Sequence, residues 1–288
     1  MQLIRYKSTI GSIELALTDG NRSIGRFSSA QTTLRDLLRL PATEFRHSLE
    51  EAVQNGKGAE IGTPLAPIDG ETEVWAAGVT YERSEVARRE ESETPDIYSK
   101  VYAAERPELF FKANARRAVG QHGRIAVRAD SSWDVPEPEL AVVSNAYGEI
   151  VGYCIGNDVS SRSIEGENPL YLPQAKVYAG SCALGPGITP AWEVPDPYGL
   201  SIHMRIERAG KQYWQGETST SELHRKLDEL VAYLYREDEF PDGAILCTGT
   251  ALVPDHPFTL EAGDVVHISI DRLGSLSNTV VRGKAALK

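Results

Sequence analysis

The feature that most limits the fold of this chain is a series of short apolar runs separated by turn residues, which begins beyond Leu109. Apolar runs of about four to eight residues between Gly, Pro and Asp are typical of β-strands, whereas core helices need longer segments with a period of about 3.6 residues. One later segment has the helical period, and we expect a helix from about residue 221 to 236, with Ser219 and Glu222 as its capping box. The sequence therefore predicts a β-rich domain with one packed helix, whose strands include residues 125–127, 140–143, 150–155, 200–206 and 265–270.

The beginning of the chain has a different pattern and predicts a small α+β domain of its own. Its expected elements are strands at 3–6 and 12–17 and helices at 33–38 and 44–55. A stretch rich in Gly and Pro then leads to Gly70, where we place the boundary between an N-terminal domain (1–70) and a larger domain (71–288). Residues 82–100 of the larger domain are heavily charged, which fits either a solvated helix with a loop or a lid over a site.

The composition argues against several classes of partner. The formal net charge of −11 over 288 residues argues against nucleic acid or an anionic membrane, because both attract basic surfaces. No apolar run approaches the ~18 residues of a membrane span, and charged residues interrupt the start of the chain, so we expect no signal peptide. The three cysteines are isolated in the sequence and are expected to be reduced, which suggests the cytoplasm. A small anionic metabolite stays compatible with the charge, because a bound cation can reverse the local potential.

Two acids one residue apart, Glu137 and Glu139, stand just before an apolar run and suggest a metal site. Side chains alternate along a strand, so both acids point to the same face. Residues 145–148 predict the turn of a hairpin, and a turn in the middle of that segment would place Glu139 opposite Cys154. Asp158 would then lie on the same face, diagonally beyond Glu137. Three converging carboxylates would repel one another strongly unless a cation lies between them.

Ligands that offer only oxygen select a hard cation, Mg²⁺, Mn²⁺ or Ca²⁺, over zinc. The six histidines form no close pair in the sequence, so a histidine-built metal site is not indicated. The alternative is that the Glu-x-Glu pattern is only the polar face of an exposed strand. The presence of Asp158 on the partner strand favours the ligand set.

Other residues of the larger domain are candidates for chemistry, each with a plain alternative. Glu108 stands beside two aromatic residues and suits proton transfer, but it could also be a surface acid at the start of a strand. Arg162 could clamp a carboxylate with two hydrogen bonds. Lys176 could neutralise an oxyanion, form a Schiff base or simply lie on the surface. Gly249 and Thr250 follow a predicted strand and suit carboxylate binding, although such a pattern is often only a turn.

Taken together, these motifs resemble the fumarylacetoacetate hydrolase family over residues 74–281. The resemblance rests on motifs in order along the chain: Pro107 to Lys112, Glu137 and Glu139 with Asp158, Ser160 and Arg162, then Lys176 before Gly180, Gly249-Thr250, 263–266 and 274–278. It implies an α+β, β-rich fold, the mixed β-sandwich roll of that family, in a homodimer or homotetramer. It also implies that Glu137, Glu139 and Asp158 hold Mg²⁺. The family acts on 2-oxo acids and diketo acids, whose carboxylate and adjacent carbonyl chelate the ion.

The departures from the family pattern narrow the expected chemistry. Hydrolases of the family commonly carry Asn-Tyr-x-x-His, but here Thr80 and Tyr81 are followed by Ser84 at the position of the histidine, which argues against C–C hydrolysis. Residues 98–102, 106–108 and 167–174 instead resemble the branch of 2-keto-3-deoxy-sugar-acid dehydratases, typified by 2-keto-3-deoxy-D-arabinonate dehydratase. This resemblance implies a set of substrate-binding residues: Thr80, Tyr81, Lys112, Arg162, Tyr171, Gly249 and Thr250.

We therefore expect residues 71–288 to form a catalytic, metal-binding domain that dehydrates a 2-keto-3-deoxy pentonate to 2,5-dioxopentanoate. Glu108 is the candidate for proton transfer at C3 and to the departing hydroxyl, and Lys176 is the candidate for stabilising the enolate. Thr250 and Arg162 would orient the substrate carboxylate. Two alternatives are a C–C bond hydrolase that acts on 2,4-diketo acids and, from a different class, a non-catalytic β-sandwich stabilised by Ca²⁺.

Overall fold

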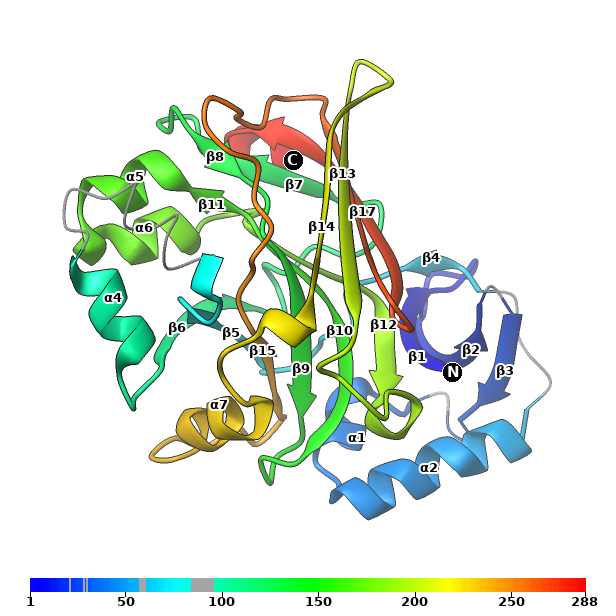
Figure 1. Ribbon diagram of the computed structural model, residues 1–288. Helices are drawn as coiled ribbons and strands as arrows, with labels where there is room; N and C mark the ends of the chain where they lie inside the picture. The colour runs from blue at the N-terminus through cyan, green and yellow to red at the C-terminus, as the bar shows by residue number, and fades with distance from the viewer. Residues whose placement is uncertain (21, 28, 30, 57–60, 84–95) are drawn as a thin grey trace.

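The computed structural model confirms a strand-rich α+β fold (Figure 1). It describes residues 1–20, 22–27, 29, 31–56, 61–83 and 96–288. Most of the charged segment 82–100, interpreted from sequence as a solvated helix or a lid, therefore lies outside the described residues; its last part belongs to helix α4 (Asp96–Ala103). In the described part of the chain, no helix is long and apolar enough to cross a membrane.

A large mixed sheet forms the centre of the molecule, with strand order β3-β2-β1-β12-β10-β9-β15-β5-β6 and β4 beside β1. Its strands are β1 (Gln2–Lys7), β2 (Ile13–Asp19), β3 (Arg22–Arg26), β4 (Thr63–Pro64), β5 (Glu73–Gly78), β6 (Glu108–Asn114), β9 (Pro138–Ser144), β10 (Ile150–Asp158), β12 (Cys182–Pro190) and β15 (Ala244–Cys247). Strands β9 and β10 lie in the middle and are buried almost throughout. They are therefore covered on both faces.

A second sheet covers one face of the first, with strand order β14-β13-β16-β17-β7. Its strands are β7 (Arg124–Val127), β13 (Ser201–Arg208), β14 (Lys211–Ser219), β16 (Val265–Ile270) and β17 (Gly274–Arg282). Leu140 and Val142 of β9 share a buried core with Ile202 and Met204 of β13 and Ile268 of β16. The even-numbered positions of β9 thus face the second sheet, as the alternation of a strand requires.

The N-terminal helices lie against the opposite face of the large sheet, and their elements are α1 (Leu34–Leu38) and α2 (Ala42–Gln54). Phe45, Leu49 and Ala52 of α2 are fully buried in a core that also contains buried residues of β9 and β15. Strand β1 pairs with β12, with Leu3 opposite Ile188, so the N-terminal strands extend the central sheet. A separate domain boundary near Gly70 stays a prediction.

The helix predicted at 221–236 is wrong at its beginning, because helix α7 runs only from Leu227 to Leu234. Ser219 caps a short 3₁₀ turn, η3 (Thr220–Glu222), in place of the long helix. The next residues pair with a distant strand end: Leu223 forms a bridge with Tyr81, and the backbone N–H of His224 donates to Thr80 O at 2.9 Å. A long-range backbone contact, which no local periodicity reveals, has replaced the first helical turns.

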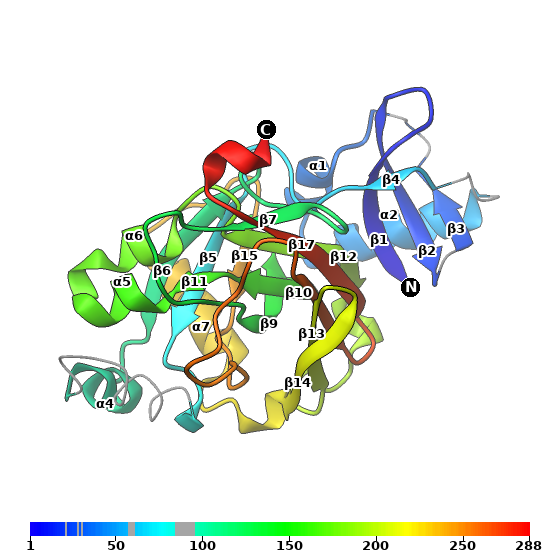
Figure 2. The ribbon, with the colours of Figure 1, turned by 90° about the horizontal axis from the view of Figure 1, so that it is seen from above.

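Short elements form a third group, which lies on the side of the molecule away from β1–β3 in both ribbon views (Figures 1 and 2). They are β8 (Asp134–Val135), β11 (Ser160–Ser161), α5 (Arg162–Glu167), η1 (Pro169–Tyr171) and α6 (Leu172–Lys176). Two further 3₁₀ turns are η2 (Ala191–Glu193) and η4 (Lys284–Leu287). Strand β10 leads through β11 into α5, so the end of the central hairpin continues directly into this group.

Candidate active site and metal centre

The β9–β10 hairpin brings Glu137, Glu139 and Asp158 together, but in a register different from the predicted one. Glu139 lies opposite Gly156 rather than Cys154, and the N–H of Asp158 donates to Glu137 O at 3.0 Å. The predicted register was wrong by two residues. An even shift keeps every side chain on its face, so the convergence of the three acids survives.

The hairpin turn explains why the register of β9 and β10 differs from the predicted one. The connection is longer than a two-residue turn, because Asn145 Oδ1 accepts the N–H groups of both Tyr147 and Glu149, at 3.0 and 2.9 Å. The register also changes by one residue between Ile150 and Gly152, as at a β-bulge. Asp158 consequently lies directly across from Glu137 and not diagonally beyond it.

The three carboxylates are buried and close together. Glu137, Glu139 and Asp158 are 3%, 1% and 1% exposed, and one oxygen of each lies within 4.8 Å of the others. Burial, and then repulsion by Asp158 and Glu137, raises the pKa of Glu139 well above its usual range. The backbone N–H of Gly249 donates to Glu139 Oε2 at 2.6 Å and fixes this carboxylate. Three buried oxygen donors with no histidine or thiolate fit a hard divalent cation such as Mg²⁺.

Three basic side chains lie among these acids. Lys176 Nζ is 2.8 Å from Glu137 Oε2 and 3.1 Å from Asp158 Oδ2, and it donates to Ser160 Oγ at 2.6 Å. Arg162 Nη2 lies 3.2 Å from Glu137 Oε1. Lys112 forms an ion pair with Asp158 Oδ1. Each of the three cations is at most 4% exposed, so the acids and bases form one buried network.

A small cavity lies beside this network and brings several predicted residues together. Its lining includes the three carboxylates and Lys176 together with Glu108, Gly249 and Thr250. The volume is about 20 Å³, which is comparable to the space of one water molecule. The cavity can therefore hold an ion, whereas a five-carbon acid needs the surrounding side chains to move.

The position of Glu108 depends on a glycine. Glu108 pairs with Gly78 across β5 and β6, and its Oε2 occupies the space where a Cβ on residue 78 would stand. The next residue, Val79, also lines the cavity and has a positive φ of 52°. This conformation is rare for a β-branched side chain and costs about 1–3 kcal/mol, so the surrounding structure holds the end of β5 in a strained state.

Other predicted substrate-binding residues lie elsewhere. Among the described residues that line the cavity, Thr80, Tyr81, Lys112, Arg162 and Tyr171 are absent. Thr80 Oγ1 donates to Thr248 O at 2.6 Å, and the buried Tyr81 hydroxyl has no hydrogen-bond partner among the described residues. Tyr171 is 37% exposed on η1. Lys112 Nζ points to two backbone carbonyls, donating to Val159 O at 3.2 Å and to Lys176 O at 2.5 Å.

One acidic residue of the cavity was not predicted. Glu165 on α5 is 6% exposed and lines the cavity with the other acids. The sequence contained one weak signal, since Glu165 follows Arg162 by three residues and would share its face on a helix. The short helix α5 itself was not predicted, because its few residues carry no apolar stripe.

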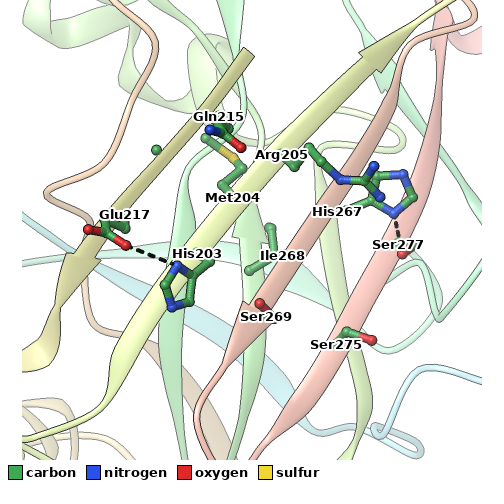
Figure 3. A pocket seen from close by; sticks show the side chains of 11 residues that line it. His203, Met204, Arg205, Gln215, Glu217, His267, Ile268, Ser269, Ser275 and Ser277 are labelled. Carbon is green, nitrogen blue, oxygen red and sulfur yellow. Dashed lines mark hydrogen bonds and ion pairs between the residues drawn. The ribbon is translucent and has the colours of Figure 1, made fainter. Parts of the chain in front are cut away.

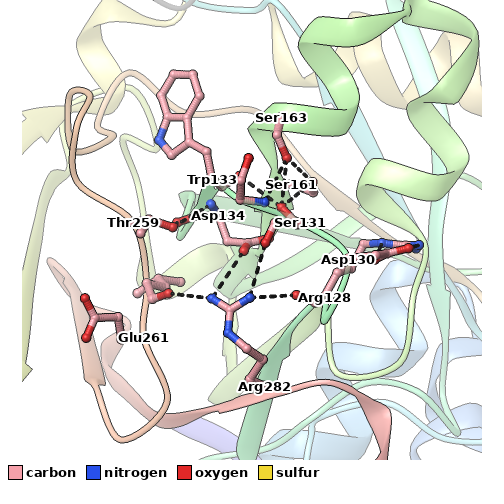
Figure 4. Close-up of polar contacts among 12 residues, drawn as sticks. Arg128, Asp130, Ser131, Trp133, Asp134, Ser161, Ser163, Thr259, Glu261 and Arg282 are labelled. Carbon is pink, nitrogen blue, oxygen red and sulfur yellow. Dashed lines mark hydrogen bonds and ion pairs between the residues drawn. The ribbon is translucent and has the colours of Figure 1, made fainter.

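A polar cluster around Arg282 holds the segment that precedes the metal ligands (Figure 4). Arg282 Nη1 donates to Arg128 O at 2.9 Å and to Ser131 O at 3.2 Å, and Arg282 Nη2 lies 3.9 Å from the fully buried Asp134. Burial raises the pKa of Asp134 to about 6. Asp134 belongs to β8, which leads into Glu137, so the cluster supports one side of the site from behind.

A larger groove of about 730 Å³ lies on the outer face of the second sheet (Figure 3). His203 there is 3.4 Å from Glu217, and His267 Nδ1 is 2.9 Å from Ser277 Oγ. In the described part of the chain, however, Glu137, Glu139 and Asp158 form the only group of three acidic, histidine or cysteine residues arranged to hold a metal. The small buried cavity is therefore the candidate active site.

The chain is similar to several proteins named as dehydratases. The protein is 50% identical to the probable 2-keto-3-deoxyxylonate dehydratase of Haloferax volcanii, over 89% of this chain and 86% of that protein. It is 42% identical to the 2-dehydro-3-deoxy-D-arabinonate dehydratase of Saccharolobus solfataricus, over 91% and 87%. A solved 2-keto-3-deoxy-D-arabinonate dehydratase in complex with magnesium and 2,5-dioxopentanoate superposes with a TM-score of 0.82 at 36% identity, over 98% and 99%. The family described as fumarylacetoacetate (FAA) hydrolase C-terminal matches residues 73–281. The chain belongs to the fumarylacetoacetate hydrolase family.

Proposed function

We propose that this protein is a magnesium-dependent dehydratase that converts a 2-keto-3-deoxy pentonate into 2,5-dioxopentanoate and water. The observation that carries the proposal is the buried set of Glu137, Glu139 and Asp158, which shares one cavity with Glu108 and Lys176. The relatives named as dehydratases, at 42–50% identity over most of the chain, support the same reaction.

The names of the two relatives describe one and the same substrate within the D series. Arabinonate and xylonate differ in configuration at C2 and C3. In the 2-keto-3-deoxy acids, C2 is a carbonyl carbon and C3 is a methylene carbon, so only C4 stays chiral. Within the D series both names therefore describe the same molecule, and we take 2-keto-3-deoxy-D-arabinonate as the substrate.

The residues of the site have different roles in the proposed reaction. Glu137, Glu139 and Asp158 hold Mg²⁺, which when bound supplies a Lewis acid for the 2-oxo acid group. Glu108 removes a proton from C3 of the substrate. Lys176 neutralises the negative charge that develops on the C2 oxygen.

The remaining residues support and orient the reacting groups. The hydroxyl of Thr250 orients the substrate carboxylate. Gly249 holds Glu139 in place, as Arg162 holds Glu137 and Lys112 holds Asp158. Thr80 and Tyr81 adjoin the cavity through Val79, and Tyr171 lies one residue before the cavity residue Leu172. We propose that these three enter the substrate site when it enlarges.

The assembly and the compartment are part of the proposal. The family resemblance supports a homodimer or homotetramer. Cys154, Cys182 and Cys247 are buried and unpaired, and burial raises the pKa of each thiol, which supports a reducing compartment such as the cytoplasm.

The test is to incubate the purified protein with ¹³C-labelled 2-keto-3-deoxy-D-arabinonate, with Mg²⁺ or with chelator, and to follow the products by NMR. We expect one product with all five carbons, 2,5-dioxopentanoate, formed only with the metal. Two smaller fragments would instead identify a C–C bond hydrolase. No turnover of this acid in either condition would refute the proposal.

A further inference from the structure

The buried face of helix α5 carries charged residues, and the proposed reaction explains why. Of the residues of α5, Arg162 and Glu165 are the buried ones. Charged side chains are rarely buried without a partner or a function, and a helix normally turns apolar residues inward. Arg162 contacts Glu137. Glu165 lies three residues further on the same face and reaches the wall of the cavity.

The proposed reaction needs proton transfers in two separate regions of the substrate, at C3 and at the C4 hydroxyl and C5. In its first stage a proton leaves C3, the C4–O bond breaks with its electron pair, and the hydroxyl takes up a proton and departs as water. A C3=C4 double bond remains. In the second stage a proton leaves C5, the double bond moves to C4=C5, and C3 regains a proton. The enol that results becomes the C5 aldehyde when its hydroxyl proton moves to C4. No external oxidant is needed, because C5 is oxidised while C4 is reduced.

The cavity offers two carboxylates for these two places once the metal ligands are set aside. Of the five described carboxylates that line it, Glu137, Glu139 and Asp158 form the metal site. Glu108 approaches from strand β6 of the central sheet, whereas Glu165 approaches from α5 in the group of short elements. The two acids thus reach the cavity from different walls, which suits a substrate whose reacting atoms are spread along its chain.

We propose that Glu165 is the second acid–base residue of this site: it protonates the departing C4 hydroxyl and, as the resulting carboxylate, removes the proton from C5. Glu108 serves C3 in both stages, first taking the proton and later returning it. Each carboxyl group ends the cycle in the protonation state in which it began. The inference rests on the proposed function and adds the residue that completes the second stage.

The test separates proton exchange at C3 from the complete reaction. Each variant is given 2-oxopentanoate with Mg²⁺ in D₂O; this five-carbon analogue has no hydroxyl to lose and reports only deuterium uptake at C3. In parallel, turnover of 2-keto-3-deoxy-D-arabinonate to 2,5-dioxopentanoate is measured. For Glu165→Gln we expect exchange within about threefold of the wild type and turnover lower by about 100-fold or more, the usual value of a general acid or base. For Glu108→Gln we expect both rates to fall.

Two further variants serve as controls. Glu167→Gln changes an exposed acid of the same helix and should leave both rates unchanged. Glu165→Ala provides a second variant, in which added formate should restore part of the turnover by replacing the lost carboxylate. Equal losses of exchange and turnover in Glu165→Gln, unchanged turnover, or no rescue by formate in Glu165→Ala would overturn the inference. A wild-type protein that forms no 2,5-dioxopentanoate would instead show that the proposed function itself is wrong.

Discussion

Replacing Lys112 with methionine removes a cation from behind the metal ligands while keeping a side chain of similar length. Lys112 is 1% exposed and forms an ion pair with Asp158. Its two carbonyl partners keep other donors, since Ser181 Oγ also donates to Lys176 O at 2.8 Å and the Tyr178 hydroxyl to Val159 O at 3.4 Å. The cost therefore comes mainly from the buried carboxylate of Asp158.

Breaking a buried ion pair typically costs about 3–5 kcal/mol, and Asp158 keeps Lys176 as a second partner at 3.1 Å. We expect the Lys112→Met variant to lose about 3 kcal/mol of unfolding free energy without metal, which corresponds to a melting temperature lower by about 5–10 °C. The assay is thermal unfolding by circular dichroism in chelator, with the exposed Lys211→Met as a matched control. A melting temperature equal to that of the control, together with a higher KM, would refute this reasoning and support Lys112 as a direct substrate ligand.

Three further substitutions test other parts of the site. Glu139→Gln relieves repulsion among the acids, so we expect its thermal stability in chelator to equal or exceed that of the wild type. We also expect no stabilisation by Mg²⁺ and turnover at least about 100-fold lower. A wild-type response to Mg²⁺ would contradict the metal site. Gly78→Ala places a Cβ against Glu108 Oε2 and should lower kcat by about 100-fold; unchanged kcat would show that Glu108 is not held there for catalysis. For Asp134, a folded-state pKa raised from 3.8 to about 6 means that its ionisation destabilises the protein as pH rises through that range, by at most about 3 kcal/mol. Asp134→Asn should therefore be more stable than the wild type at pH 8 and similar at pH 4 in melting experiments; a constant difference would contradict this.

The sequence predicted which residues would converge, because the face of a strand depends only on parity. Glu137 and Glu139 had to share a face, and any even shift of the hairpin register leaves Asp158 on that face as well. The absolute register was not predictable in the same way. It depends on Asn145 accepting two backbone N–H groups and on a bulge after Ile150, and neither the side-chain contact nor the bulge has a periodic signature.

What the sequence could not supply came from contacts between distant segments. The segment before α7 resembles a helix by its own pattern, but Leu223 pairs with Tyr81 instead. The family resemblance implied that Lys112 binds substrate, but the pairing of β5 and β6 shifts by one residue around Lys112, as at a β-bulge, and Lys112 is turned toward the backbone of Val159. Glu165 lies on a helix too short to show amphipathic periodicity. In each case, tertiary contacts decide the outcome.

The charges of the site connect metal binding with the acid that the reaction requires. Five carboxylates line the cavity, and three cations contact the metal-binding acids, so a fully ionised site has two more negative than positive charges among the described residues. A divalent cation removes this excess, and the substrate adds one carboxylate. The added negative charge favours a proton on one carboxyl group of the coupled set. The proposed reaction needs one protonated acid for the departing C4 hydroxyl, and this charge balance accommodates it.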